Sequence, residues 1–192
     1  MAQYGFYFDM TACGGCKTCQ IACNDRNDLK PGTLFRRVKG FEGGKFPTPW
    51  VYYLSITCNH CKEPKCVEGC PTQAMHKLEN GIVAHDKSKC IGCRYCTWSC
   101  PYGVPQFIEE TGQVSKCDMC QNLVEKGENP ACVDACTMRA IKWGELDELR
   151  AKYGADAVSD LPVLPSSSKT TPSVLIKPKT VALNKEFIVK ED

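Results

Sequence analysis

The sequence predicts an α+β fold made of short strands, short helices and long loops, followed by an extended C-terminal tail. Three observations lead to this prediction. The sixteen cysteines of the 192-residue chain fall into four groups of four, with none left over. A short apolar or alternating stretch precedes each group, as expected for brief strands that lead into loops. The groups also resemble one another in pairs, so the chain has the form of a duplicated unit.

The cysteine groups follow the order a, b, a, b along the chain. The stretch "CGGCKTC" at 13–19 resembles "CIGCRYC" at 90–96, and "CVEGCPTQAM" at 66–75 resembles "CVDACTMRAI" at 132–141. The members are Cys13, Cys16, Cys19 and Cys23; then Cys58, Cys61, Cys66 and Cys70; then Cys90, Cys93, Cys96 and Cys100; and finally Cys117, Cys120, Cys132 and Cys136. The repeat indicates four related units.

The remaining elements are assigned from local pattern. The last cysteine of each group lies in one or two predicted helical turns, and Pro130 suits the first turn of the last of them, where a missing N–H costs nothing. The segment 145–154, "ELDELRAKYG", is a predicted amphipathic helix that ends at Gly154. Residues 24–57, rich in Pro and Gly, are a predicted insertion between the first two groups. The predicted strands cover 4–10, 51–57, 81–86 and 112–115.

The C-terminal part has a different composition. From about residue 160, "LPVLPSSSKTTPSVLIKPK" is rich in Pro, Ser and Lys. A tail of that composition is not expected to build a core of its own. The prediction is therefore an extended segment that is either disordered or laid across a partner.

Composition and charge narrow the class of protein. Hydrophobic residues make up 43% and charged residues 24%, and the length suits one domain or two small fused halves. The apolar stretch "WVYYLSI" at 50–56 is far shorter than the roughly 20 residues of a membrane-spanning helix, so none is predicted. The N-terminus has no secretory pattern. We therefore expect a cytoplasmic protein or one exported with a signal-bearing partner. The formal net charge of +2 argues neither for nor against nucleic acid.

The cysteine spacing indicates iron–sulfur chemistry. Zinc sites usually separate two cysteine pairs by a dozen or more residues, and cysteines two apart rarely form a disulfide without strain. The stretch from Cys90 to Pro101 matches the C-x2-C-x2-C-x3-C-P pattern of a bacterial [4Fe–4S] ferredoxin. The second group adds two residues to one loop, and the first has Asn24 in place of the proline. The fourth has a long gap and Thr137 after its last cysteine, so alone it could pass for a zinc site. Together, the groups predict four [4Fe–4S] clusters.

Four such clusters would change the charge of the protein. An oxidised cluster with its thiolates carries about −2, so the net charge becomes roughly −6. Basic residues in or beside the loops would offset this charge and help to set the reduction potentials, although solvated loop positions are the more common role for any one of them. These residues are Lys17, Lys62, Lys65, Arg94 and Lys116.

The motifs "YGFYFD…CGGCKTCQIAC", "YYLSITCNHC", "AMHK", "CIGCRYC…CPYG" and "KCDMC" resemble the iron–sulfur subunit of the dimethyl sulfoxide reductase family of molybdoenzymes. The resemblance covers about residues 3–155. It implies two fused bacterial-ferredoxin-like halves: an outer half from 1–57 and 106–155, an inner half from 58–105, and the tail from 156–192. It also implies electron transfer from a quinol-oxidising membrane anchor subunit to a molybdopterin catalytic subunit in anaerobic respiration.

The resemblance further implies a nested ligand pattern, whose four quartets we name sites 1 to 4. Site 1 would be Cys13, Cys16, Cys19 and Cys136; site 2 Cys23, Cys117, Cys120 and Cys132; site 3 Cys58, Cys61, Cys66 and Cys100; and site 4 Cys70, Cys90, Cys93 and Cys96. The repeat order alone would equally permit the first group to pair with the second. Because some relatives lack the cysteine at the position of Cys93 and hold a three-iron cluster, site 4 is expected to hold a complete one. Sites 1 and 2 would face the molybdenum subunit, and sites 3 and 4 the anchor.

Other side chains near the ligands have lesser expected roles. His76 lies six residues after Cys70 and could accept a proton when a quinol is oxidised, although a purely hydrogen-bonding role is the more common one for such a residue. Tyr95 and Trp98 are expected to shield a cluster from water. His60 and His85 are expected to be structural.

The sequence favours an electron-transfer subunit without substrate chemistry of its own, because no nucleophile–base pair, phosphate loop or dinucleotide fingerprint is present. A free-standing polyferredoxin carrier is the alternative, and it would purify without a large partner. A zinc-stabilised, nucleic-acid-binding protein would be colourless, and no basic stripe supports it. The subunit is expected at the membrane through its partners, on the periplasmic side by co-export or on the cytoplasmic side.

Overall fold

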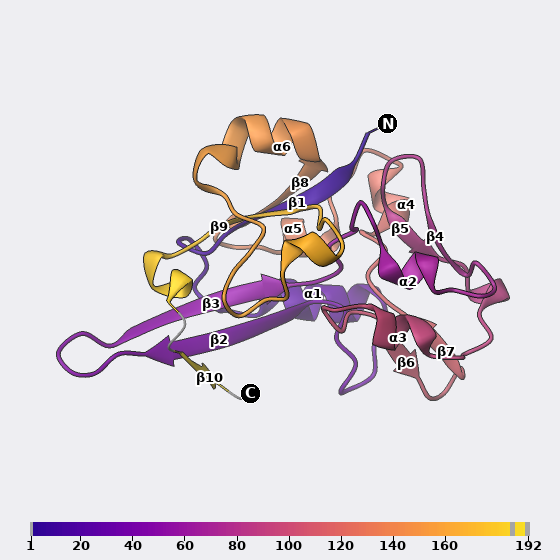
Figure 1. Cartoon of the computed structure of the whole chain (residues 1–192), viewed down its shortest axis with the longest axis horizontal. Coiled ribbons are helices and arrows are strands. Elements are labelled where there is room, and N and C mark those ends of the chain that lie inside the picture. Colours follow the sequence, from indigo (N-terminus) through magenta and orange to yellow (C-terminus); the bar gives the residue numbers. More distant parts are fainter. Residues whose placement is uncertain (1, 185–186, 191–192) are drawn as a thin grey trace.

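A computed structural model describes residues 2–184 and 187–190 and confirms the α+β class. Within these residues the strands form two three-stranded sheets and two two-stranded ones, joined by short helices and long loops. The two larger sheets lie in one part of the molecule and the two small hairpins in another, while one ribbon of strands projects to the side (Figure 1). In the part of the chain that the structure describes, we find no helix whose length and apolar character would allow it to cross a bilayer.

The first sheet is built around the N-terminal strand. Strand β1 (Tyr4–Asp9) pairs antiparallel with β8 (Ile141–Glu145) and parallel with β9 (Val174–Lys177). Because side chains alternate along a strand, Phe6 and Phe8 enter the main core while Tyr7 packs on the other face. There Tyr7 stacks on Tyr153 at the end of α6 (Leu146–Tyr153), with ring centroids 4.5 Å apart. The predicted helix is thus confirmed, with Gly154 as its C-cap.

The predicted insertion is an ordered hairpin. Strands β2 (Arg37–Gly43) and β3 (Trp50–Ile56) pair antiparallel along their full length and form the projecting ribbon of Figure 1. Strand β10 (Ile188–Lys190) pairs with the other edge of β2. The inward side chains Val38, Tyr52 and Leu54 are fully buried in the main core. Strand β3 corresponds to the strand predicted at 51–57, whereas β2 was not predicted, because it contains Gly40 and Gly43 and lies in a Pro- and Gly-rich stretch.

The short helices pair in a way that joins distant parts of the sequence. Helix α1 (Thr18–Arg26), from the first cysteine group, packs against α5 (Ala131–Asp134), from the fourth. Helix α2 (Lys65–Glu68), from the second group, packs against α3 (Tyr95–Ser99), from the third. Helix α4 (Gln121–Val124) follows Cys120. The outer groups therefore meet each other, and so do the inner ones.

Two small hairpins complete the inner half. Strand β4 (Met75–Lys77) pairs with β5 (Val83–His85), and β6 (Gln106–Ile108) with β7 (Gln113–Ser115). Val114 of β7 packs with Met75 and Val83 in a separate small core. The hairpin β6–β7 thus packs with β4 and β5, and Gln106 of β6 also accepts the backbone N–H of Leu34 at 3.1 Å.

The C-terminal segment packs on the body of the protein, which corrects the expectation of a tail that is disordered or laid across a partner. Leu161, Leu175 and Ile176 are buried, and Ile176 forms a backbone bridge with Val158. The prediction counted the Pro, Ser and Lys residues of this segment, yet "SVLIK" has enough apolar character to add a strand beside β1. Its 3-10 turns are η2 (Gly154–Asp156), η3 (Ser167–Lys169) and η4 (Thr180–Leu183), and η1 (Lys87–Lys89) lies earlier, before Cys90.

Candidate iron–sulfur sites

The first and third cysteine loops share one backbone conformation. Gly15 and Gly92 both have a positive φ, of 74° and 71°, and the residues two positions later, Lys17 and Arg94, are also left-handed. The glycines are required, since a Cβ at Gly15 would overlap the ring of Tyr53 and one at Gly92 the carbonyl oxygen of Gly112. The left-handed residue then begins α1 or α3 directly. The sequence repeat is therefore also a structural repeat.

The second and fourth groups share a different local fold. Pro64 and Pro130 are the N-caps of α2 and α5, one residue before the first helical turn in which Pro130 was expected. After each helix, the backbone turns back and donates an N–H to the last cysteine. The N–H of Met75 reaches Cys70 Sγ at 3.4 Å, and the N–H of Ala140 reaches Cys136 Sγ at 3.3 Å. Such donors stabilise a thiolate.

Two cavities are each lined by one complete quartet of cysteines. Site 1 (Cys13, Cys16, Cys19 and Cys136) surrounds a small hollow together with Phe8, Val38 and Ser55. Site 4 (Cys70, Cys90, Cys93 and Cys96) surrounds another, with Met75 and Val114. Each hollow thus brings together three cysteines of one group and the last cysteine of another.

Sites 2 and 3 are buried more deeply. Burial raises the pKa of Cys23, and the neighbouring thiols of Cys117, Cys132 and Cys120 raise it further. In site 3, burial raises the pKa of Cys66 to about 12, with Cys58, Cys100 and Cys61 adding to the rise and Lys116 opposing it. The thiols that raise the pKa of Cys23 and of Cys66 are thus members of the quartets expected for sites 2 and 3.

Neighbouring sites lie close together, since Cys19 and Cys132 share one buried cluster, and Cys58 and Cys117 share another. Burial raises the pKa of Cys19 in site 1, and Cys132 of site 2 is among the thiols that add to the rise. Burial likewise raises the pKa of Cys117 in site 2, with Cys58 of site 3 as the next cause. Sites 3 and 4 are linked through two chain segments, since Cys66 and Cys70 flank the end of α2 and Cys96 and Cys100 the end of α3. The four sites thus follow one another in the order 1, 2, 3, 4.

Exposure differs between the ends and the middle of this series. Among the sixteen cysteines, the exposed ones are Cys16 in site 1 and Cys93 in site 4. The cysteines of sites 2 and 3 are buried or half-buried. An electron entering or leaving the series would therefore do so most readily at site 1 or site 4.

The quartets fit [4Fe–4S] clusters chemically. All sixteen thiols are free, and burial raises the pKa of most of them, so gathering them as thiolates in the interior is costly in the absence of a cation. Bound iron deprotonates a thiol outright, which removes the cost of gathering four thiolates in one buried place. The backbone N–H donors at Cys70 and Cys136 suit the same charge.

Lys116, expected as a loop cation, is instead 4% exposed. Its ammonium donates to the backbone carbonyls of Val83 and Cys117, the latter at 2.9 Å. In contrast, Lys65 is exposed and pairs with Glu68 at 2.7 Å, and Arg94 stacks on Phe107. Lys116 therefore belongs to the interior beside site 3, while the other two are surface residues.

His60 is fully buried and hydrogen-bonded on both sides, in agreement with the expected structural role. Burial holds its pKa well below the usual value, assisted by the charges of Lys116 and Arg36. Its Nδ1 accepts the N–H of Val83 at 3.0 Å, so the ring proton is on Nε2, which lies 3.9 Å from Cys117 Sγ. A neutral imidazole therefore bridges β5 and a site 2 ligand.

Replacing His60 with leucine is expected to lower the free energy of unfolding by about 1–3 kcal/mol, because the buried N–H of Val83 loses its acceptor. Chemical denaturation of the iron-loaded protein would measure the change. His85→Leu is the matched control, since Nε2 of His85 is buried without a hydrogen-bond partner among the described residues. Equal losses in both variants would contradict the role given to His60.

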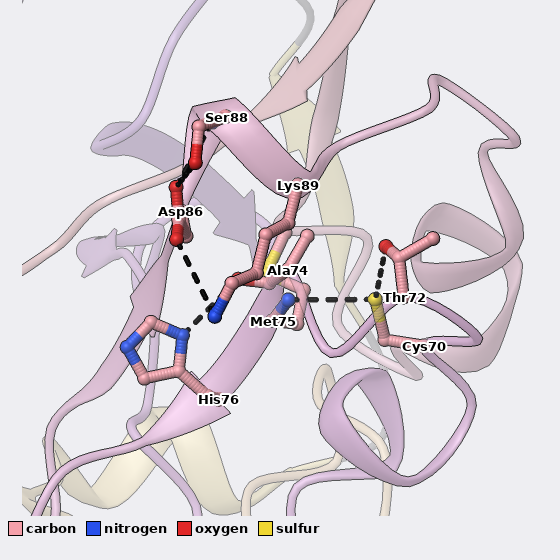
Figure 2. A network of polar contacts seen from close by, with 8 residues as sticks. All are labelled: Cys70, Thr72, Ala74, Met75, His76, Asp86, Ser88 and Lys89. Atoms are coloured by element: carbon pink, nitrogen blue, oxygen red, sulfur yellow. Dashed lines mark hydrogen bonds and ion pairs between the residues drawn. The ribbon is translucent and has the colours of Figure 1, made fainter.

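His76 lies on the side of β4 away from Cys70, beside Asp86 and Lys89 (Figure 2). Its Nδ1 donates to the carbonyl oxygen of Ala74 at 3.2 Å, which leaves Nε2 as the nitrogen able to accept a proton. Around Cys70, the sulfur accepts the N–H of Met75 and lies 3.8 Å from the hydroxyl of Thr72. His76 is thus near site 4 along the chain but turned from its ligands.

Tyr95 and Trp98 were expected to shield a cluster from water, and the structure does not confirm this role. Trp98 is 80% exposed and Tyr95 52% exposed, so within this chain neither covers a site fully. The ring of Tyr95 packs on Gly69, where an added Cβ would collide with it.

Arg36 is the residue that sequence reasoning missed. It lies just before β2, far in sequence from most ligands, and it is 2% exposed. Its guanidinium faces cysteines of both site 1 and site 2. The available sequence signal, an arginine in a Pro- and Gly-rich segment, does not indicate burial, because arginine is rarely buried without a partner.

Comparison with known proteins finds an iron–sulfur domain family and subunits of reductases. A family described as a 4Fe–4S dicluster domain matches residues 49–146. The chain is 47% identical over 184 residues to the B subunit of the anaerobic dimethyl sulfoxide reductase of Escherichia coli (strain K12), covering 92% of this chain and 89% of that one. It is 44% identical over 191 residues to the Haemophilus influenzae protein of the same name, covering 95% and 92%. It is 39% identical over 151 residues to a thiosulfate reductase electron transfer subunit of Salmonella typhi, covering 76% and 78%.

Proposed function

The chain belongs to the dimethyl sulfoxide reductase family of molybdoenzymes as an iron–sulfur subunit, and on this premise we propose that it relays electrons through four [4Fe–4S] clusters. The donor is a quinol-oxidising membrane anchor subunit, and the acceptor is a molybdopterin catalytic subunit. A [4Fe–4S] cluster supplies one-electron transfer by alternating between two oxidation states. The chain itself has no substrate chemistry in this proposal.

The series of four cysteine quartets is the observation that carries the proposal. Thiols of sites 1 and 2 lie close enough to raise one another's pKa beyond the effect of burial, as do those of sites 2 and 3. Cys16 and Cys93 are exposed at the two ends, so each end can meet a different partner. Two exposed ends and a buried middle suit a relay between two proteins. By family analogy, site 1 is the catalytic-subunit end and site 4 the anchor end.

A complex with a large partner distinguishes this function from that of a free-standing carrier. The tagged chain, expressed with its partner subunits and purified without oxygen, is expected to bring down a molybdopterin protein and a membrane protein. Rapid-freeze EPR after addition of a quinol is then expected to show reduced clusters. A chain that purifies alone and is not reduced by quinol would contradict the proposal and favour a soluble polyferredoxin. Protease accessibility of the complex in intact cells would assign the side of the membrane, periplasmic or cytoplasmic.

We also propose that His76 receives a proton near the anchor end, since its Nε2 is the nitrogen left to accept one. His76→Gln is expected to slow quinol oxidation by the complex several-fold without slowing turnover with an artificial electron donor. Glu79→Gln, at an exposed position between β4 and β5, is the control. An equal decrease with both donors would assign His76 a structural role.

Lys116 is expected to raise the reduction potential of site 3. Burial raises the pKa of Cys58 and Cys66, and the buried positive charge of Lys116 opposes this rise. The same charge would stabilise the reduced state of the site, which carries one more negative charge. Lys116→Met is expected to lower the potential of that site by about 59 mV or more, a tenfold change for one electron. EPR-monitored redox titration measures it, with the exposed Lys65→Met as control. Equal shifts in the two variants would contradict a specific effect.

A further inference from the structure

Arg36 occupies a buried position between the two sites of the outer half. Its Nη1 donates to Ser55 Oγ at 3.0 Å, and that hydroxyl lies 3.5 Å from Cys19 Sγ of site 1. The guanidinium lies over the ring of Phe6, 5.1 Å from its centroid. Nε and Nη2 are buried and have no partner of regular hydrogen-bond geometry among the described residues. Two N–H donors are therefore held inside the protein beside the thiols.

Arg36 lies beside both sites, because its partner Ser55 contacts Cys19 of site 1, and Cys19 belongs to the same buried cluster as Cys132 of site 2. Burial raises the pKa of Cys19 in site 1, and the guanidinium is the largest influence that lowers it. Burial also raises the pKa of Cys23 and Cys132 in site 2, and Arg36 opposes the rise in each. A guanidinium does not deprotonate in proteins, so this charge is fixed. A buried fixed charge without a carboxylate partner is costly, which indicates that its partner is the negative charge of the loaded sites.

On the basis of the proposed function, we propose that Arg36 raises the reduction potentials of sites 1 and 2 together, with its fixed charge and its buried Nε and Nη2 donors held beside their sulfur ligands. Reduction adds one electron, and thus one negative charge, to a site whose ligands already carry negative charge. A positive charge in a medium of low dielectric stabilises that added electron, and hydrogen bonds to sulfur act in the same direction. Arg36 itself neither gains nor loses a proton in the step.

The shared position has a consequence for the relay. One cation next to both sites shifts their potentials in the same direction, so loss of its charge is expected to lower both. Lys116 lies beside Cys58 and Cys66 of site 3 and would act there separately. The outer pair of sites therefore depends on one residue.

The test compares Arg36→Gln, Arg36→Lys and the adjacent Arg37→Gln in the purified complex, by EPR-monitored redox titration of all four clusters. In Arg36→Gln, the equilibrium constant for reduction is expected to fall at least tenfold at two clusters, about 59 mV for one electron, and less than threefold at the other two. Arg36→Lys is expected to restore most of the loss, and Arg37→Gln to change none of the four. An unchanged pair in Arg36→Gln, or an equal shift of all four clusters, would overturn the proposal.

The iron content of the wild-type protein tests the proposed function independently of the role proposed for Arg36. If wild-type protein holds four clusters, the function stands whatever the potentials of the variants show. If Arg36→Gln fails to load iron, a measurement on wild-type protein decides. With arginine labelled isotopically at the guanidino nitrogens, hyperfine spectroscopy of reduced sites 1 and 2 is expected to detect a coupled nitrogen that Arg36→Lys lacks. Absence of that coupling in wild-type protein would overturn the proposal.

Discussion

Removal of iron is expected to unfold the inner half of the chain while part of the outer half stays folded. The inner half has a small apolar core, whose buried members are Cys66, Met75, Val83, Cys96 and Val114. Two of these five, Cys66 and Cys96, are expected ligands. Units of this size usually depend on a metal, a disulfide or a partner for their stability, and binding of a metal that the unfolded chain cannot hold becomes folding free energy.

The outer half differs because its two three-stranded sheets bury large side chains, among them Phe8, Tyr52 and Ile141. Hydrogen exchange after oxidative iron removal and chelation is the measurement. Amides of β4 to β7 are expected to exchange as in an unfolded chain, and those of β1, β3 and β8 to keep measurable protection. Protection of β4 to β7 equal to that in the loaded protein would show that the iron does not support this half.

Replacement of Cys13 or Cys136 by serine is expected to affect the same cluster, although 123 positions separate them in the sequence. Both line the hollow of site 1, and burial and the charge of Cys136 raise the pKa of Cys13. Each variant is expected to lose at most about four of about sixteen irons and to alter the same EPR component.

Cys70→Ser is the discriminating comparison for this pairing. The repeat order alone would allow the first group to share a cluster with the second, in which case Cys13→Ser and Cys70→Ser would alter one component. Because Cys70 lines the hollow of site 4, the two variants are expected to alter different components. A shared component would contradict the nested pairing and favour pairing of adjacent groups.

The cysteine loops were predictable from sequence because their backbone is fixed by local requirements. Gly15 and Gly92 adopt left-handed conformations that the repeated "CxGC" spelling reveals. The helix 145–154 was predictable for a similar reason, since Gly154 closes an amphipathic segment. Where a backbone conformation depends on residues only a few positions apart, the sequence pattern is sufficient to predict it.

Arg36 and Lys116 could not be predicted in the same way, because their burial depends on distant segments. Arg36 is enclosed with Phe6, Ser55 and cysteines of two groups, and Lys116 with Val83 of another strand. The same is true of the C-terminal segment. Its composition is that of a tail, but "SVLIK" pairs with the edge of β1, which is distant in sequence. Tertiary contacts decide these positions, and no short window of sequence contains them.

The content of iron in the anaerobically purified chain is the most direct measurement. A chain with four [4Fe–4S] clusters is expected to contain about sixteen irons and about sixteen sulfides per polypeptide, with little zinc. The dithionite-reduced sample is expected to give the coupled EPR spectrum of several neighbouring clusters. A colourless, zinc-rich and iron-poor protein, from a preparation shown not to have lost clusters, would contradict the electron relay.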